Sequence, residues 1–438
     1  MRERIAERPS GYAPRHVLLA LALFLNFRTF QYFPGMAAVE EAWFILCFLA
    51  FAGFYPLWKL QEGLRFTRFE LYTLAVTLVL PILPALGAYG EFGQPLVFGL
   101  LAQRSAALVA GLLLLLIAIR SRAILVADLE RALLIAAWTS FFLFSAMQLL
   151  LDPSRFSDYQ GTFVLLASGK YAFRLPSDFL LFGVIYYTLR GLRTKRKRDY
   201  VLAFVLFVSI IGGNGSSRML CICLLSTFLI FLYRWRSLGQ SLAATLRFSA
   251  VLVLLVAAAS LVNPAFIVAR GASFSSAFQV VHNGAEGDDA SANLRLIEIL
   301  AAAPYLQKHP LLGSGELSHQ WQGGPTFLTS GYFNDSDIGL FGIVFAYGVL
   351  GLLFFACQYR YALRAARILG AHAGPLGDAA KGFLVFSAID SVTTGAFVFN
   401  LNITLFFILV LSGIASQMPH DRHLPRETAP CNLPELAS

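Results

Sequence analysis

Long apolar runs recur along almost the whole chain, from Val17 to Met418. A helix needs about 20 predominantly apolar residues to cross the hydrocarbon core of a bilayer. Only 13% of the 438 residues are charged, whereas an ordinary soluble domain carries about 25%. The sequence therefore predicts an all-α integral membrane protein, with one polytopic domain over residues 1–438 and no room for a large soluble catalytic domain.

Breaks rich in charged residues, Gly or Pro divide these runs into twelve predicted spans. The spans lie at residues 16–33, 43–58, 70–89, 102–119, 132–151, 178–191, 200–213, 219–233, 248–268, 336–357, 381–398 and 400–417. Lys and Arg collect in alternate connections, with 25 of the 34 on one side. Because retained loops collect basic residues, we expect both ends, including the tail at 418–438, in the cytoplasm. The net charge of +9 then reflects topology, and we expect no nucleic-acid partner.

The five cysteines lie in apolar segments, at their ends or in the tail, and form neither a CxxC pair nor a Cys/His metal spacing. We therefore expect no disulfide, no metal site and no cofactor. The basic residues before Val17 resemble the start of a signal peptide, but no A-x-A cleavage site follows. The first span is expected to stay uncleaved.

Two connections on the predicted outer side are long, residues 152–177 and residues 269–335. Within the second, apolar residues at helical spacing predict a helix over Leu294–Lys308 that lies on the outer membrane surface. Pro304 is expected to kink or end that helix. The Gly-rich stretch at 313–331 is not expected to form a regular element.

Nine basic residues on the predicted outer side oppose the topology signal: Arg28, Arg104, Arg155, Lys170, Arg174, Arg218, Arg270, Arg295 and Lys308. An anionic ligand would explain them, and ordinary solvated loop charges are the alternative. Arg104 and Arg218 abut apolar runs, where a charge is expensive. Arg218 also closes the turn GGNGSSR (212–218), whose free N–H groups and guanidinium can hold a phosphate. A helical hairpin whose arginine snorkels to the interface is the alternative.

Acidic residues near the outer side are candidate proton acceptors. Asp335 and Asp337 precede a Gly-rich span, and carboxylates at a low-dielectric boundary have raised pKa values and can act as general bases. Capping of the following helix is the alternative for both. Glu298 follows Arg295 by three residues, which is also the spacing of an ordinary surface ion pair.

His282, His309 and His319 fall in the long outer loop, where a general base can sit. Of these, His319 is the catalytic candidate, and His309 joins Arg104 as a candidate for substrate binding. Asp390 lies in an apolar stretch beside Ser and Thr residues. It is expected to face the bundle interior, either as a proton relay or as a polar contact between helices.

Three of these motifs, in this order, resemble the bacterial O-antigen polymerase and O-antigen ligase superfamily. They are the turn that ends in Arg218, then Arg295 some fourteen residues before HPLLGSG (309–315), then SDIGLFGIVFAYGVLG (336–351). The resemblance covers residues 214–351 and extends to the remainder only by topology. It implies a C-type glycosyltransferase-like helical bundle.

The resemblance also implies an activity: metal-independent glycan transfer on the outer face of the inner membrane from an undecaprenyl-diphosphate-linked oligosaccharide. Arg218 and Arg295 match the arginines that are thought to bind the donor diphosphate. Two guanidinium groups at the lipid boundary would stabilise the charge of the leaving diphosphate. The implied partners are this lipid-linked donor, membrane lipid, a chain-length regulator and a flippase.

One departure from the family pattern bears on the reaction. Ligases of the superfamily typically have a histidine before the last part of the motif, and this chain has Asn334-Asp335-Ser336-Asp337 there. The acidic residues favour a polymerase, including an exopolysaccharide polymerase, with Asp337 and then Asp335 as the expected base. Two alternatives stay open: a ligase that passes glycan to a lipid or protein acceptor, and a transporter or flippase in which Asp390 couples an anionic substrate to protons.

Overall fold

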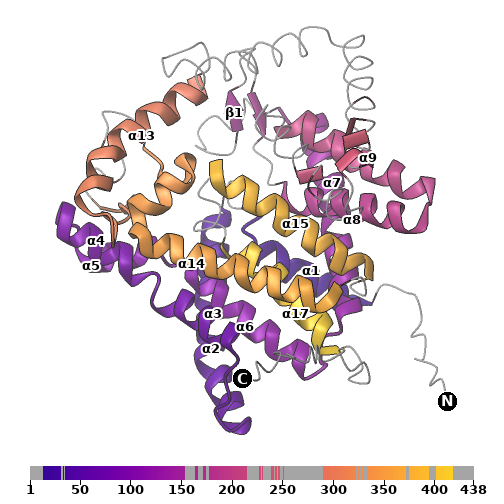
Figure 1. Cartoon of the computed structure of the whole chain (residues 1–438), viewed down its shortest axis with the longest axis horizontal. Helices are drawn as coiled ribbons and strands as arrows, with labels where there is room; N and C mark the ends of the chain where they lie inside the picture. The colour runs from indigo at the N-terminus through magenta and orange to yellow at the C-terminus, as the bar shows by residue number, and fades with distance from the viewer. Residues whose placement is uncertain are drawn as a thin grey trace, which may run out of the picture.

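The computed structural model describes residues 13–30, 33, 35–152, 163–165, 171–173, 177–214, 226–227, 229, 238–240, 242–243, 245–246, 250, 290–321, 324, 328, 333–370, 374–393 and 401–417. Helices dominate this part of the chain (Figure 1). In chain order they are α1 (Pro14–Asn26), α2 (Met36–Gln61), α3 (Arg68–Leu78), α4 (Ile82–Phe92), α5 (Leu96–Ala102), α6 (Ala106–Arg120), α7 (Val126–Leu150), α8 (Asp178–Thr194), α9 (Lys197–Asn214), α13 (Ala290–Lys308), the 3-10 helix η3 (Asp335–Ile338), α14 (Leu340–Leu369), α15 (Gly374–Thr393) and α17 (Leu401–Gln417).

The helical class is confirmed, with one small exception. β1 (Phe163–Leu165) and β2 (Tyr171–Phe173) pair antiparallel within the connection predicted at 152–177, with Val164 opposite Ala172. The sequence analysis placed no strand there. Three-residue strands are too short to show a period-2 pattern, so the hairpin leaves little trace in the sequence.

Ten of the twelve predicted spans overlap helices, whereas those at 219–233 and 248–268 lie almost wholly outside the described residues. Within the described part, four helical segments are long and apolar enough to cross a membrane: Met36–Gln61, Arg68–Phe92, Val126–Leu150 and Leu340–Leu369. A fifth arises if α5 and α6, bent by 52°, count as one span. The chain is therefore a multi-pass membrane protein, and the count of twelve stays a prediction.

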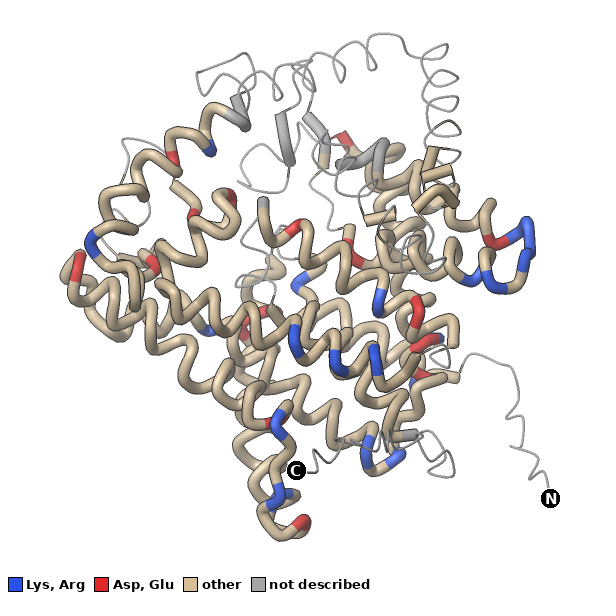
Figure 2. The backbone as a smooth tube through the Cα atoms, viewed as in Figure 1, with Lys and Arg blue, Asp and Glu red and all other residues tan. Residues whose placement is uncertain are grey.

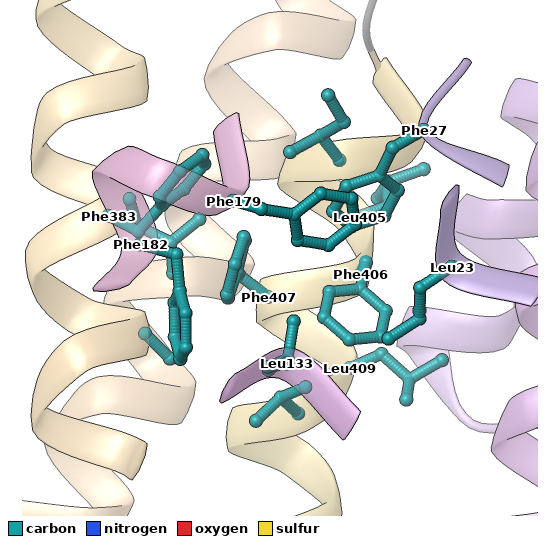
Figure 3. Packing of buried hydrophobic residues seen from close by; sticks show 14 of the residues in the cluster. Leu23, Phe27, Leu133, Phe179, Phe182, Phe383, Leu405, Phe406, Phe407 and Leu409 are labelled. Atoms are coloured by element: carbon teal, nitrogen blue, oxygen red, sulfur yellow. The ribbon is translucent and has the colours of Figure 1, made fainter. Parts of the chain in front are cut away.

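An aromatic core holds the centre of the bundle together (Figure 3). Phe407 of α17 stacks on Phe383 of α15, with ring centroids 4.2 Å apart, and on Phe182 of α8 at 5.5 Å. The neighbouring Phe406 meets Phe27, just after α1, edge to face at 5.2 Å. Residues 401–411 of α17 are all buried. Helix α17 is therefore the central element on which α1, α8 and α15 pack.

A buried ionic cluster joins the ends of α2, α3 and α6. The Lys59 side chain is almost fully buried, and its ammonium lies 2.6 Å from Glu70, which also contacts Arg120 at 3.0 Å. Glu70 accepts the backbone N–H of Thr67 at 2.8 Å, which caps α3.

Figure 2 shows basic residues at the lower end of α2 and in the α8–α9 turn, whereas α13 lies at the opposite, upper left side. The sidedness of the basic loops stays a prediction.

Helix α14 is broken at Gly348, whose φ of 62° and ψ of −161° are not helical. The loop after α13 docks at this break and supplies the missing backbone partners. Three hydrogen bonds join them: Ser314 N to Phe345 O (2.7 Å), Val349 N to Pro310 O (2.8 Å) and Leu350 N to Leu311 O (3.3 Å). A break at membrane depth is tolerated where other protein groups satisfy the backbone in this way. The docking fixes residues 310–315 against α14.

Glycine is required on both sides of this contact. Gly313, Gly315 and Gly348 have φ values of 74°, 90° and 62°. A Cβ on Gly348 would overlap the carbonyl group of Leu311, and one on Gly315 would overlap the backbone of Ala88 in α4. The loop thus packs between α14 and α4. Its backbone lies closer to the backbones of both helices than a side chain at these glycines would allow.

The predicted surface helix is present as α13, but it begins at Ala290 and runs on to Lys308. Pro304 was expected to kink or end this helix. The helix does not end there, because four helical residues follow the proline. A proline removes one helical hydrogen bond, and packing can retain the helix around that loss. The stretch 313–321 contains no helix or strand, as predicted.

Replacing Gly348 with Ala should lower the thermal stability of the purified full-length protein. A left-handed backbone costs a residue with a side chain about 1–2 kcal/mol, and the overlap with Leu311 adds to that cost. The matched control is Gly53→Ala in α2, where a Cβ meets nothing within 4 Å and alanine favours the helix. Fluorescence-detected melting in detergent checks both, and equal melting temperatures for the two variants would contradict the docking described above.

Candidate functional site

The chain after the docked loop lines a cavity of about 140 Å³. The lining residues come from the loop, from η3 and its approach, and from α14: Glu316, Leu317, His319, Leu328, Phe333, Asn334, Asp335 and Phe345. Two of these residues are acids in an otherwise mostly apolar wall. The cavity adjoins the tip of the molecule where α4, α5, α13 and α14 meet, at the left of Figure 1.

Glu316 enters the cavity directly after Gly315. Its carboxylate accepts a hydrogen bond from the Gln103 side chain, and Gln103 in turn accepts the Tyr347 hydroxyl proton at 2.7 Å. Gln94, between α4 and α5, fixes the same segment, since its amide donates to Glu316 O at 3.2 Å and accepts from Ser318 N at 2.8 Å. Burial raises the pKa of Glu316 to about 7, against the opposing effects of the Gln103 hydrogen bond and the Arg104 charge.

Asp335 faces Glu316 across the cavity from the first residue of η3. Its residue surface is 7% exposed, and its Oδ2 atom has no hydrogen-bond partner among the described residues. Burial and the nearby charge of Glu316 raise the pKa of Asp335 well above its usual range. The Asn334 side chain positions this turn by accepting Ser336 N at 3.2 Å.

Helix α13 fixes the same turn from the other side. Glu298 is fully buried and accepts Asn334 N at 2.9 Å. Burial raises the pKa of Glu298 to about 7, against the Asn334 hydrogen bond that lowers it. The sequence offered this carboxylate as the partner of Arg295, but no ion pair joins the two side chains, and Glu298 instead holds the approach to Asp335.

Arg295 lies one helical turn before Glu298. Its Nε atom is buried and has no hydrogen-bond partner among the described residues. A buried guanidinium nitrogen without a partner is costly, so a native acceptor is expected. The charge of Arg295 acts on Glu298, and its Nε atom is left able to donate to a ligand.

The other described cations of the predicted outer side contact carboxylates. Arg104 Nε lies 2.5 Å from Glu41, and Arg28 lies 3.3 Å from Glu40. Neither belongs to the cavity lining. For Arg104, the proposed binding residue, this pairing provides a structural role.

His309 and Lys308 share one acid at the end of α4. Glu91 lies 2.6 Å from the Nε2 atom of His309 and 2.8 Å from the Lys308 ammonium. The contact ties the start of the docked loop to α4, so the geometry gives His309 a positioning role. Whether it also touches substrate stays a prediction.

The remaining predicted site residues are placed as follows. His319 lines the cavity and is exposed. Asp337 lies two residues beyond Asp335 in η3, is half-buried and is not part of the lining. Arg218, with the whole turn around it, lies outside the described residues.

Glu316 and Glu298 are the residues that sequence reasoning missed as site residues. Glu316 immediately follows HPLLGSG. The signal available in the sequence was an acid directly after the two glycines of this motif, which the structure shows to dock on the broken helix α14. Glu298 was read as half of a surface ion pair. The pattern of α13 alone cannot show that this face is covered by the chain at 333–338.

Residues 201–356, from within α9 to within α14, match the family model described as O-antigen ligase. The matched region includes the docked loop, α13, η3 and both acids of the cavity. No curated protein matches the chain.

Glu298→Gln should make the protein less sensitive to pH. The folded state holds a proton on Glu298 between about pH 4.5 and about pH 7, where the unfolded chain has lost it, so this group lowers stability as pH rises through that window. Glutamine keeps the acceptor for Asn334 without the charge. We expect the variant to melt a few degrees above wild type at about pH 8 and to match it at about pH 4.5. A variant that melts below wild type at the higher pH would contradict a raised pKa of Glu298.

Proposed function

We propose that this chain, which belongs to the O-antigen ligase and polymerase superfamily, polymerises lipid-diphosphate-linked oligosaccharide repeats into a surface polysaccharide. The observation that carries the proposal is the cavity lined by two acids, and the buried, unpartnered Nε of Arg295 on α13 adds a cation that can receive a ligand. The family acts on lipid-linked glycans. A glycosyl transfer from such a donor needs a base for the acceptor and a cation for the leaving diphosphate.

In this proposal, Arg295 and Arg218 bind the diphosphate of an undecaprenyl-linked donor. Arginine suits the role because its planar guanidinium offers paired donors to phosphate oxygens. The unpartnered Nε of Arg295 supports its half of the assignment. Charge that develops on the departing diphosphate is stabilised most strongly where water is excluded.

An aspartate at position 335 or 337 accepts the proton of the attacking acceptor hydroxyl. The cavity favours Asp335, because Asp335 lines it and Asp337 does not. A base works best when its pKa lies near the working pH, and burial moves the pKa of Asp335 in that direction. Attack opposite the leaving diphosphate inverts the anomeric centre. His319, at the same cavity, is the second candidate for proton transfer.

The setting that goes with this reaction is the outer face of a bacterial inner membrane, with both ends of the chain in the cytoplasm and the segment 269–335 in the periplasm. A flippase delivers the donor to that face, and a chain-length regulator is a natural partner for a polymerase. The separation of basic turns from α13 in Figure 2 supports this orientation.

A ligase that transfers finished glycan to a lipid or protein acceptor is the second candidate function. The description of the matching family names a ligase. The acids at the cavity, where ligases of the superfamily typically carry a histidine, favour the polymerase.

Deletion of the gene in its own host should leave single repeat units on the lipid carrier and remove the polymer. Analysis of the lipid-linked glycans by mass spectrometry and of the surface polysaccharide by gel separates the candidates. Full-length polymer stranded on its carrier would indicate a ligase. An unchanged glycan profile would contradict both enzyme assignments.

Arg295→Ala should reduce polymer formation by about 100-fold or more, because it removes a charge-assisted contact made in the transition state. Arg295→Lys should restore a part, since lysine keeps the charge but not the paired geometry. Arg193→Ala is the matched control, an exposed arginine that pairs with Asp378 at 3.4 Å. Complementation of the deletion strain, with immunoblots of membrane fractions, gives the readout; full polymer from Arg295→Ala would remove this residue from the site.

A further inference from the structure

Two acids share the cavity, and each is held there by a different part of the chain. Glu316 comes from the loop docked at the break of α14, and Asp335 comes from η3. Both are desolvated. Two carboxyl groups in one small, poorly hydrated space cannot both carry a negative charge without a large penalty. One proton divided between them is the arrangement with the lowest cost.

The hydrogen bonds around the two groups are unequal. Glu316 accepts from Gln103, which the Tyr347 hydroxyl orients at 2.7 Å. Asp335 keeps its Oδ2 atom unpartnered among the described residues, although this residue is more than nine-tenths buried and lines the cavity. An orphaned buried oxygen of this kind needs a partner. A hydroxyl group that enters the cavity would supply it.

Within the described part of the chain, no cation in direct contact neutralises the pair. Arg104 acts on Glu316 at a distance, and its Nε lies 2.5 Å from Glu41. The other ionisable groups that face the pair are Asp337 beside Asp335, Glu298 beyond it on α13, Tyr347 of α14 and the exposed His319 at the cavity. Asp337 and Glu298 add negative charge when ionised, so they also favour a retained proton.

We propose that Glu316 and Asp335 form a proton-sharing carboxyl pair, and that this pair is the base that deprotonates the acceptor hydroxyl. The inference rests on the proposed glycan transfer and specifies its base. Asp335 touches the hydroxyl and is the catalytic member. Glu316 acts through Asp335 and is the positioning member, because the proton that it shares sets the proton affinity of Asp335.

The step balances without any further reactant. The acceptor oxygen forms a bond to the anomeric carbon of the donor, and the bond from that carbon to the diphosphate oxygen breaks. The diphosphate leaves with the electron pair. The hydroxyl proton passes to Oδ2 of Asp335, so the pair holds two protons, and one is then released to water before the next turnover.

The test is the pH profile of transfer from a lipid-linked repeat unit, measured with the full-length protein in membrane vesicles. Wild type should gain activity as pH rises and the pair loses the first of its two protons. In Glu316→Gln no proton can be divided between the two side chains, so the acid limb of the profile should shift by about one unit or more while transfer persists. Asp335→Asn should lose about 100-fold or more at every pH. Glu62→Gln, which removes an acid that pairs with Lys59 at the far end of α2, should keep the wild-type profile.

A second measurement does not depend on activity. Infrared difference spectra at neutral pH should show the carbonyl band of one protonated carboxyl that is missing in both Glu316→Gln and Asp335→Asn. An unmoved pH profile in Glu316→Gln, together with a retained band, would overturn the pair while leaving glycan transfer intact. Full activity in Asp335→Asn, with loss in Asp337→Asn or His319→Asn, would assign the base elsewhere. Absence of any transfer by the wild-type protein would overturn the proposed function and the pair together.

Discussion

The docking of residues 310–315 at the break in α14 is the contact on which the candidate site depends. Helical hydrogen bonds that Gly348 interrupts are replaced by bonds to the loop, so the break and the loop stabilise each other. Glycines on both partners allow their backbones to approach without side chains between them. The residues that follow this contact place Glu316 in the lining of the cavity, together with Asp335. Precise placement of reacting groups on a rigid scaffold is what catalysis requires.

Charged residues on the predicted outer side of the bundle fall into two groups with different surroundings. Arg28, Arg104 and Lys308 contact carboxylates and stabilise the fold. Arg295, Glu316 and Asp335 are desolvated without such full compensation. Groups of the second kind gather where a protein does chemistry, because their energies change when a ligand arrives. Whether a charged residue has a compensating partner thus indicates whether it stabilises the fold or is available to bind a ligand.

Much of the architecture could be predicted from apolar runs, because span length is dictated by the bilayer and leaves a strong local pattern. The helical class and the helix α13 both came from such patterns, whereas the importance of HPLLGSG came from the family resemblance. The site was harder, since its environment is made by contacts across the chain. Arg104 looked free because its partner Glu41 lies 63 residues earlier, and Glu316 looked ordinary because Gln103 is 213 residues away. The sequence ranked Asp337 before Asp335 as the base, but the turn of η3 places Asp335 and not Asp337 in the cavity lining. Short elements, such as the β1–β2 hairpin, carry too few residues for a pattern.

The partners that confine Glu316 come from both ends of the sequence. Gln94 and Gln103 lie in the early turns before and after α5, whereas Tyr347 and the break in α14 are synthesised more than 200 residues later. During synthesis the early half therefore enters the membrane long before the elements that complete the cavity exist. A chain whose translation stops before α14 would insert its first arginines and apolar surfaces into the bilayer. It would lack the cavity that encloses the acids. The cavity is therefore complete only after the chain has been synthesised through α14. A product truncated before α14 lacks the complete site.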